Sequence, residues 1–129
     1  MQIIVSTLMS VNKVILVGNV GKAPEMKYVG DRPYARFTLA TSEPAYTDAS
    51  GARVPEITEW HNIIMWDDFA RTAERYITKG TKLYIEGKLR TRVWQDFNAI
   101  KRSVTEIIVE RFDILARSLP GSAPAAPAN

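Results

Sequence analysis

The sequence predicts an all-β domain with one helix, arranged as a five-stranded Greek-key barrel. Most of the chain between residues 11 and 119 consists of short β-branched and aromatic runs separated by Gly, Pro and Asp, which is typical of strands. One segment alone has apolar residues at helical spacing. It follows the third of five strand-like segments, so the expected order is three strands, one helix and two strands.

The first three strands are expected at residues 12–17, 36–41 and 57–66. NKVILV is a β-branched run that ends at Gly18, and RFTLAT alternates polar and apolar residues. ITEWHNIIMW forms the third strand. Between the second and third strands, residues 46–55 are rich in Asp, Ser, Gly and Pro, which predicts a long exposed loop or a hairpin tip.

The helix is expected directly after the third strand. Asp67 or Asp68 is a suitable N-cap. Lys79 followed by Gly80 predicts the C-terminal stop. The apolar residues that share one helical face are Phe69, Ala73, Tyr76 and Ile77.

The last two strands are expected at residues 80–95 and 103–114. Gly87 stands where a strand can bend sharply at a barrel corner. A five-stranded Greek-key barrel with a helix between strands three and four is an OB-fold. The order of elements therefore predicts this fold.

The fourth strand, in GTKLYIEGKLRTRVW, separates into two faces when read with a period of two. The face expected to enter the core carries Leu83, Ile85, Leu89 and Val93. The opposite face carries Lys82, Tyr84, Glu86, Lys88, Arg90, Arg92 and Trp94. Cations neutralise phosphates and flat rings stack on unpaired bases, so this second face predicts binding of a single-stranded nucleic acid.

The third strand repeats this pattern. Trp60, Asn62, Ile64 and Trp66 share one face, and Ile57, His61, Ile63 and Met65 share the other. If both strands belong to one barrel, the three tryptophans Trp60, Trp66 and Trp94 line a common path. The alternative for each tryptophan is core packing, and Trp66, beside the helix start, could instead plug the barrel. Most surface Lys and Arg simply solvate the surface.

Composition limits the classes of function. The chain has 129 residues, a net charge of +3 and a pI near 9.3, which fits one mildly basic domain. Without cysteine, disulfides, thiolate nucleophiles and cysteine-bound zinc are excluded. GNVGK is too short for a phosphate loop, and the lone His61 is better explained by packing or an interface. We therefore expect a binding protein with no cofactor, metal or catalytic residue.

We divide the chain into an N-terminal extension (1–10), a folded domain (11–118) and a tail (119–129). The extension is apolar but lacks the basic region of a signal peptide, so it is expected to be an extra strand or a segment upstream of a second start at Met9. The tail is rich in Pro and Ala, which predicts disorder. No apolar run reaches the ~20 residues of a membrane span.

Four segments closely resemble the bacterial single-stranded DNA-binding protein family. They are VNKVILVGNVGKAPEMKY (11–28), RFTLATSE (36–43), TEWHNIIMW (58–66) and KGTKLYIEGKLRTRVW (79–94). The resemblance implies an OB-fold that forms a homotetramer and wraps single-stranded DNA without sequence preference. It also implies a role in replication, recombination and repair in the cytoplasm, at the nucleoid.

The resemblance implies specific site residues. Bases would stack on Trp60, Trp66 and Trp94, with Tyr46 as the match for a fourth aromatic residue. His61 would lie near the subunit interface, where we also place Tyr84. The expected phosphate contacts are Lys13, Lys27, Lys79, Lys88, Arg90 and Arg92.

The chain also departs from the family pattern. Asn62, Asp68 and Val93 replace basic residues of well-known members, which predicts weaker or less salt-resistant binding. The tail lacks the acidic tip that recruits replication and repair enzymes, so either the chain is truncated or such recruitment differs. Three rivals stay open at this point: a primosome-type protein that bridges single strands and partner proteins, a nuclease on the same fold, and an RNA-binding module.

Overall fold

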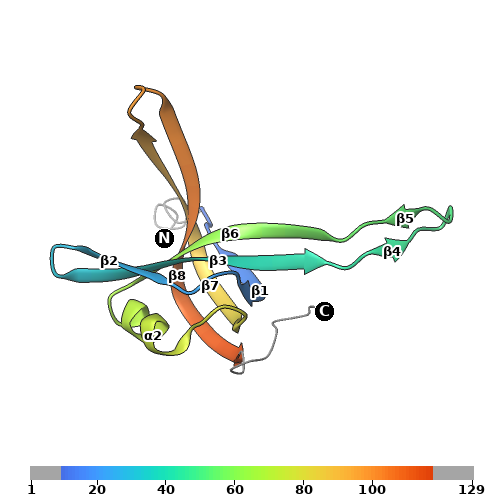
Figure 1. The fold of residues 1–129 in the computed structure, drawn as a ribbon, viewed down its shortest axis with the longest axis horizontal. Helices are drawn as coiled ribbons and strands as arrows, with labels where there is room; N and C mark the ends of the chain where they lie inside the picture. The colour runs from blue at the N-terminus through green and yellow to red at the C-terminus, as the bar shows by residue number, and fades with distance from the viewer. Residues whose placement is uncertain (1–9, 118–129) are drawn as a thin grey trace, which may run out of the picture.

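The computed structural model describes residues 10–117. The predicted tail (119–129) and, apart from Ser10, the predicted N-terminal extension lie outside the described residues. Figure 1 shows strands that curl around one another, with the single described helix packed at one end. The elements are β1 (Val14–Val20), β2 (Glu25–Val29), β3 (Arg32–Glu43), β4 (Tyr46–Thr47), β5 (Arg53–Val54), β6 (Ile57–Trp66), α2 (Asp68–Tyr76), β7 (Lys82–Gln95) and β8 (Lys101–Ala116).

Five strands close into a barrel. The hydrogen-bonded order is β1-β7-β8-β6-β3, and β3 returns to β1 through the pairs Asn19 with Ala40 and Val20 with Leu39. All of these pairings are antiparallel except β6 with β8, which is parallel. This closed ring, with α2 between β6 and β7, confirms the predicted OB-fold.

The strands are more numerous than predicted; β1, β3 and β8 are longer, β6 has the predicted bounds, and β7 starts two residues later. Residues 25–29 form β2, which the sequence analysis missed and which pairs with the first part of β3 through a turn at Gly30. The predicted loop at residues 46–55 contains the short hairpin β4–β5. Most of β2 is exposed, so its sequence lacks the apolar alternation that marks a half-buried strand.

The helix is shorter than predicted and its contacts differ in part. Asp67 occupies the N-cap position, but it forms no side-chain cap and its carboxylate binds Arg32 instead. Of the residues predicted to share one apolar face, Ala73 is buried, whereas Tyr76 is exposed. Ile77 is buried just beyond the last helical residue, where the chain turns back to β7.

The core lies inside the ring and under α2. It is formed by Val20, Ala35, Phe37, Leu39, Ile63, Met65, Ala70, Ala73, Ile77, Leu83, Ile85, Ile107 and Val109. None of the described helices is long and apolar enough to cross a membrane.

The β7–β8 pair leaves the barrel halfway along its length, as the upper arm in Figure 1 shows. The pairing register shifts between Glu86 and Gly87, and a Cβ at Gly87 would collide with the carbonyl of Ile108. The predicted bend at Gly87 is therefore confirmed. Beyond it, Leu89 and Val93 are exposed, so their predicted burial was wrong, because the hairpin has no barrel behind it.

Candidate nucleic-acid interface

One outer face of the barrel runs across β3 and β6. Antiparallel pairing sets Tyr34 opposite Trp66, Thr38 opposite Asn62 and Ala40 opposite Trp60. Since alternate residues share a face, both tryptophans of β6 lie on the same outer surface. The residues between them on the opposite face, Ile63 and Met65, are fully buried. The predicted division of this strand into two faces is confirmed.

The same face continues onto β8 and β7. Asn62 pairs with Glu106 of β8, and Glu106 pairs with Arg90 of β7. Arg92 and Trp94 follow on the same side of β7, as alternation requires. The structure therefore places Trp60, Trp66 and Trp94 on one continuous surface, as predicted. We call this surface, formed by the outward residues of β3, β6, β8 and the second half of β7, the aromatic face.

Trp60 lies open on the aromatic face, with 60% of its surface exposed. Its ring covers Gly21 so closely that a Cβ at residue 21 would collide with it and with the Thr38 hydroxyl. A small pocket opens in the same region, lined by Lys22, Ala23, Glu25, Arg36, Phe37, Thr38 and Asn62. A base on Trp60 would thus have cations and hydrogen-bonding groups at its edge.

Trp66 is half-buried and does not plug the barrel. Its ring centroid lies 4.9 Å from that of Tyr34, and the Arg32 guanidinium lies 4.5 Å from the Trp66 centroid. Asp67 holds Arg32 through two hydrogen bonds of 2.9 and 3.2 Å. These hydrogen bonds lower the pKa of Asp67, so this carboxylate is charged at neutral pH. Trp66 is therefore a fixed platform, part of which Arg32 covers.

Glu106 is a buried carboxylate in the middle of the aromatic face, only 5% exposed. Its oxygen lies 3.1 Å from Nη2 of Arg92 and 3.9 Å from Nη1 of Arg36. Arg92 donates to both Glu106 oxygens, from Nε at 3.5 Å and from Nη2 at 3.1 Å, and its other amino group is not bonded to Glu106. Glu106 thus fixes two arginines that remain accessible from the surface.

Other predicted basic residues are free of carboxylates. Within residues 10–117, no ion pair involves Lys27, Lys88 or Arg90. Lys27 pairs with Tyr34 in the sheet and so extends the aromatic face onto β2. Lys79 lies in the turn after α2, whose Gly80 donates a hydrogen bond to the Val20 carbonyl near Trp60.

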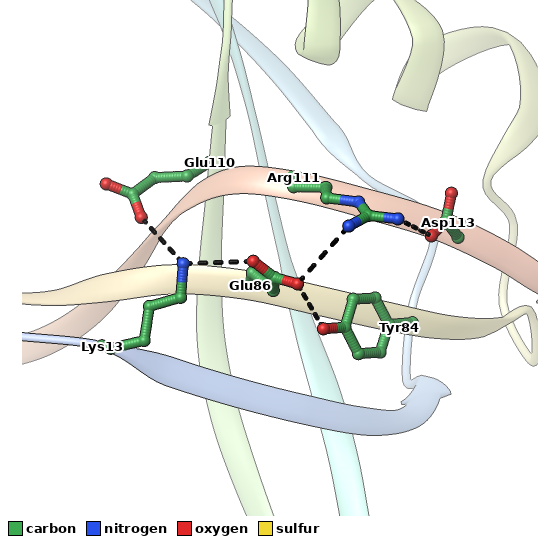
Figure 2. A network of polar contacts seen from close by, with 6 residues as sticks. All are labelled: Lys13, Tyr84, Glu86, Glu110, Arg111 and Asp113. Atoms are coloured by element: carbon green, nitrogen blue, oxygen red, sulfur yellow. Dashed lines mark hydrogen bonds and ion pairs between the residues drawn. The ribbon is translucent and has the colours of Figure 1, made fainter.

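Lys13 and Tyr84 lie on a different part of the outer surface, formed by β1, the first half of β7 and the end of β8 (Figure 2). Lys13 Nζ lies 3.1 Å from Glu86 and 3.7 Å from Glu110. Tyr84 donates a hydrogen bond to Glu86, and Arg111 lies 3.8 Å from the same carboxylate. We call this surface the paired face.

The paired face separates Lys13 from the other predicted phosphate contacts. Hydrogen bonds from Tyr84 and Lys13 lower the pKa of Glu86, and the bond with Glu86 raises the pKa of Lys13. Lys13 is therefore engaged with carboxylates before any ligand arrives. Its contact with DNA stays a prediction, and its surroundings favour a role at an interface.

Tyr46 and His61 lie where the sequence placed them relative to Trp60. Tyr46 is exposed on the β4–β5 hairpin, at the end of the arm that β3 and β6 form to the right in Figure 1. His61 alternates with Trp60 and points to the opposite face, where its ring lies 2.9 Å from the Thr41 hydroxyl. Tyr46 is therefore accessible at the end of this arm, and its contact with bases stays a prediction, whereas His61 lies on the face opposite to Trp60.

Comparison with known proteins agrees with this geometry. Residues 11–115, almost the whole described chain, match the model of the Single-strand binding protein family. The chain belongs to this family. Its OB-fold and its single-strand binding function follow from that membership together with the observed barrel.

The chain is similar to two curated proteins from bacteria and to a solved structure from Plasmodium falciparum. The chain is 48% identical over 109 residues to the single-stranded DNA-binding protein of Bacteroides thetaiotaomicron, covering 84% of this chain and 68% of that protein. It is 43% identical over 114 residues to that of Rhizobium meliloti, covering 87% of this chain and 65% of that protein. A solved structure of the Plasmodium falciparum SSB complex with ssDNA superposes with a TM-score of 0.71 at 32% identity, covering 84% and 96% of the two chains.

Several residues of this single-strand binding protein's aromatic face were missed by sequence analysis. Tyr34, Arg36 and Arg32 belong to the first half of β3, which was expected to start only at Arg36. Extending the period-two pattern to Arg32 would have placed all three on one face of the strand, although not beside Trp66, because that contact depends on the pairing of β3 with β6. Glu86 was expected as the carboxylate of this face, but the structure gives that position to Glu106. No pattern in the sequence alone identifies that pairing.

Proposed function

We propose that this protein binds single-stranded DNA without sequence preference across the aromatic face. The observation that carries the proposal is the convergence of Trp60, Trp66 and Trp94 on one outer surface together with the unpaired Lys27, Lys88 and Arg90. Bases stack on the tryptophans and on Tyr46, and phosphates contact the cations. Stacking contributes about 1–3 kcal/mol per base and accepts every base, because each has a π-face.

Affinity and orientation come from different groups on this face. Lysine and arginine release counterions from the DNA backbone, which supplies a salt-dependent and sequence-independent free energy. Arg92 is held by two hydrogen bonds to Glu106 and presents its remaining donors to phosphate, with Arg36 nearby at 3.9 Å from the same carboxylate. The aromatic side chains then fix where the bases lie. The expected biological result is protection of exposed single strands in replication, recombination and repair, in the cytoplasm.

We further propose that the protein acts as a homotetramer assembled through the paired face. Ile15 and Val17 are exposed there, opposite Glu86 and Tyr84 of β7. Among residues 10–117, the β1 edge from Val14 to Gly18 pairs with β7 alone, so these residues cover no other side of it. Exposed strand edges with apolar side chains are suited to pairing with another copy. When one single-stranded DNA occupies several subunits of a tetramer, binding to the first subunit raises the effective concentration of the DNA at the others.

The test is tryptophan fluorescence during titration with poly(dT), compared with duplex DNA of equal length at equal salt. We expect strong quenching by poly(dT), weak quenching by duplex, and saturation at a defined number of nucleotides per tetramer. Absence of quenching by poly(dT) would contradict stacking on the tryptophans. A dimeric mass and a sub-stoichiometric protein partner would instead indicate the primosome-type function.

Two controls separate the remaining rivals. Incubation of end-labelled single strands with magnesium or calcium reports nuclease activity, and we expect the strands to stay intact. Competition between poly(dT) and poly(U) measures preference for DNA, since stacking and phosphate contacts by themselves do not exclude RNA.

A further inference from the structure

The tip of the β7–β8 hairpin carries an aromatic residue that no part of the proposed site uses. Phe97 is fully exposed, and Ile100, in the same turn, is about half-exposed. The turn directly follows Trp94 and Gln95 at the end of β7. The Phe97 ring contributes nothing to the core, and its position after the end of β7 leaves it accessible to a strand bound on the aromatic face.

The turn that holds Phe97 is tightly bonded. The Asp96 carboxylate accepts hydrogen bonds from the backbone N–H groups of Asn98 (2.9 Å) and Ile100 (3.0 Å). It also accepts one from Nε of Arg102 (2.9 Å). These bonds lower the pKa of Asp96, so they persist at neutral pH. The backbone at Phe97 is therefore ordered before any ligand binds, which reduces the entropic cost of using its ring.

Charge on the hairpin indicates the chemistry of the ligand. Between residues 88 and 106, five cations accompany two carboxylates, Asp96 and Glu106, and each of these already pairs with an arginine. The cations are Lys88, Arg90, Arg92, Lys101 and Arg102. Two copies of such a hairpin repel each other, whereas a polyanion with flat rings matches both the charge and the aromatic tip.

We propose that Phe97 is a further base-stacking residue, which receives a nucleotide of the single strand as it passes beyond Trp94. The inference rests on the proposed binding of single-stranded DNA. It extends the path of contacts from the barrel to the end of the hairpin. Lys101 and Arg102 pair with Gln95 and Trp94 across the hairpin. Arg102 is held by Asp96, whereas Lys101, in no ion pair among residues 10–117, lies beside this path to meet its phosphates.

The experiment compares Phe97→Ala, Phe97→Leu and Phe97→Trp in binding to fluorescein-labelled oligo(dT) at constant salt. We expect about a fivefold loss of affinity for the alanine and leucine variants, the lower end of what one stacked base contributes. The tryptophan variant retains affinity and adds quenching. Leucine separates stacking from simple apolar contact. Tyr76→Ala, which removes an exposed aromatic residue from α2, is the matched control and leaves affinity unchanged.

Three results would overturn the inference. If all Phe97 variants bind as the wild type does while Trp94→Ala weakens binding, the hairpin tip makes no contact and the proposed function stands. If the wild type itself does not bind oligo(dT), both proposals fail together. If Phe97→Ala instead reduces the mass of the assembly in analytical ultracentrifugation, the tip contacts a second copy of the chain.

Discussion

The aromatic face and the paired face are two parts of one outer sheet surface, and they use the same residue types differently. Both carry lysine, arginine and tyrosine on exposed strands. On the paired face, Lys13 and Arg111 are both bound to carboxylates. On the aromatic face, Lys88 and Arg90 have no such partner among the described residues, and tryptophans lie beside them. The aromatic face thus combines arginines held by carboxylates, such as Arg92, with unpaired cations and tryptophans, whereas Lys13 and Arg111 of the paired face are both held by carboxylates.

The largest expected effect comes from placing a charge on the paired face. Ile15→Glu puts a carboxylate beside Glu86 on an exposed strand, so we expect the assembly to dissociate into smaller species. Affinity for poly(dT) then falls at least about tenfold through the loss of linked sites, while affinity for an eight-nucleotide strand stays the same. Analytical ultracentrifugation and anisotropy measure both. A tetramer that survives Ile15→Glu would contradict the role of this face, and Tyr76→Glu on α2 is the control.

Removing one tryptophan of the aromatic face should lower affinity and leave the assembly intact. Trp60→Ala and Trp94→Ala should each weaken binding of poly(dT) by about 1–3 kcal/mol, the contribution of one stacked base, without changing the mass of the assembly. Both side chains are well exposed, 60% and 44%, so circular dichroism should show an intact fold. Unchanged affinity at matched salt would exclude stacking on that residue.

A smaller effect on affinity is expected when Gly21, which the Trp60 ring covers, is substituted. Gly21→Ala adds a methyl group that would collide with the ring, so we expect the ring to move and affinity to fall by up to about fivefold. In a Trp60→Ala background the same change should cost nothing further. Equal losses in both backgrounds would show that Gly21 acts on binding independently of Trp60.

Substituting one arginine on each face compares the salt dependence of binding that each face supplies. Arg90→Gln should reduce the slope of log affinity against log salt by about 0.7, the value expected for one phosphate contact with a single strand. Arg111→Gln should leave that slope unchanged, because Arg111 is already bound to Glu86 and Asp113. Equal slopes for the two variants would contradict the distinction between paired and unpaired cations.

The smallest expected effect is a dependence of stability on acid pH. The pKa of Glu86 is lower in the folded protein than its ordinary value of 4.5, owing to Tyr84 and Lys13. Its stabilisation is therefore complete above the unfolded pKa and is lost as the pH falls through the folded pKa. We expect the melting temperature to fall more steeply below about pH 4.5 in the wild type than in Glu86→Gln. Parallel curves would show that Glu86 contributes no such stabilisation.

Local patterns predicted most of this architecture. Alternation placed Trp60 and Trp66 on one face of β6 and His61 on the other, and Gly87 marked the bend of β7. Alternation within one strand is a local property, so a sequence expresses it directly. It failed for Leu89 and Val93, because whether a face is covered depends on which strands lie behind it.

Local alternation could not predict the contacts between strands that are distant in the sequence. Lys13 and Arg92 are both basic residues of exposed segments, yet one meets Glu86 and Glu110 and the other meets Glu106. Which carboxylate lies opposite which cation depends on strand order and on the register shift at Gly87. Likewise, Arg32 reaches Trp66 only because β3 and β6 pair over ten residues.

The distance between the two tryptophans of β6 sets the spacing of the bases that can stack on them. Six residues of extended strand separate Trp60 from Trp66, a distance of about 20 Å at ~3.4 Å per residue. A stacked strand of DNA advances ~3.4 Å per nucleotide, so the two rings engage bases roughly six nucleotides apart if the strand stays stacked. Between the two rings, the outward residues of this strand are Asn62 and Ile64, of which Ile64 is buried, so β6 offers no further aromatic surface there. On this strand, stacking contacts are therefore spaced apart, and the nucleotides between them have no aromatic side chain of β6 to stack on.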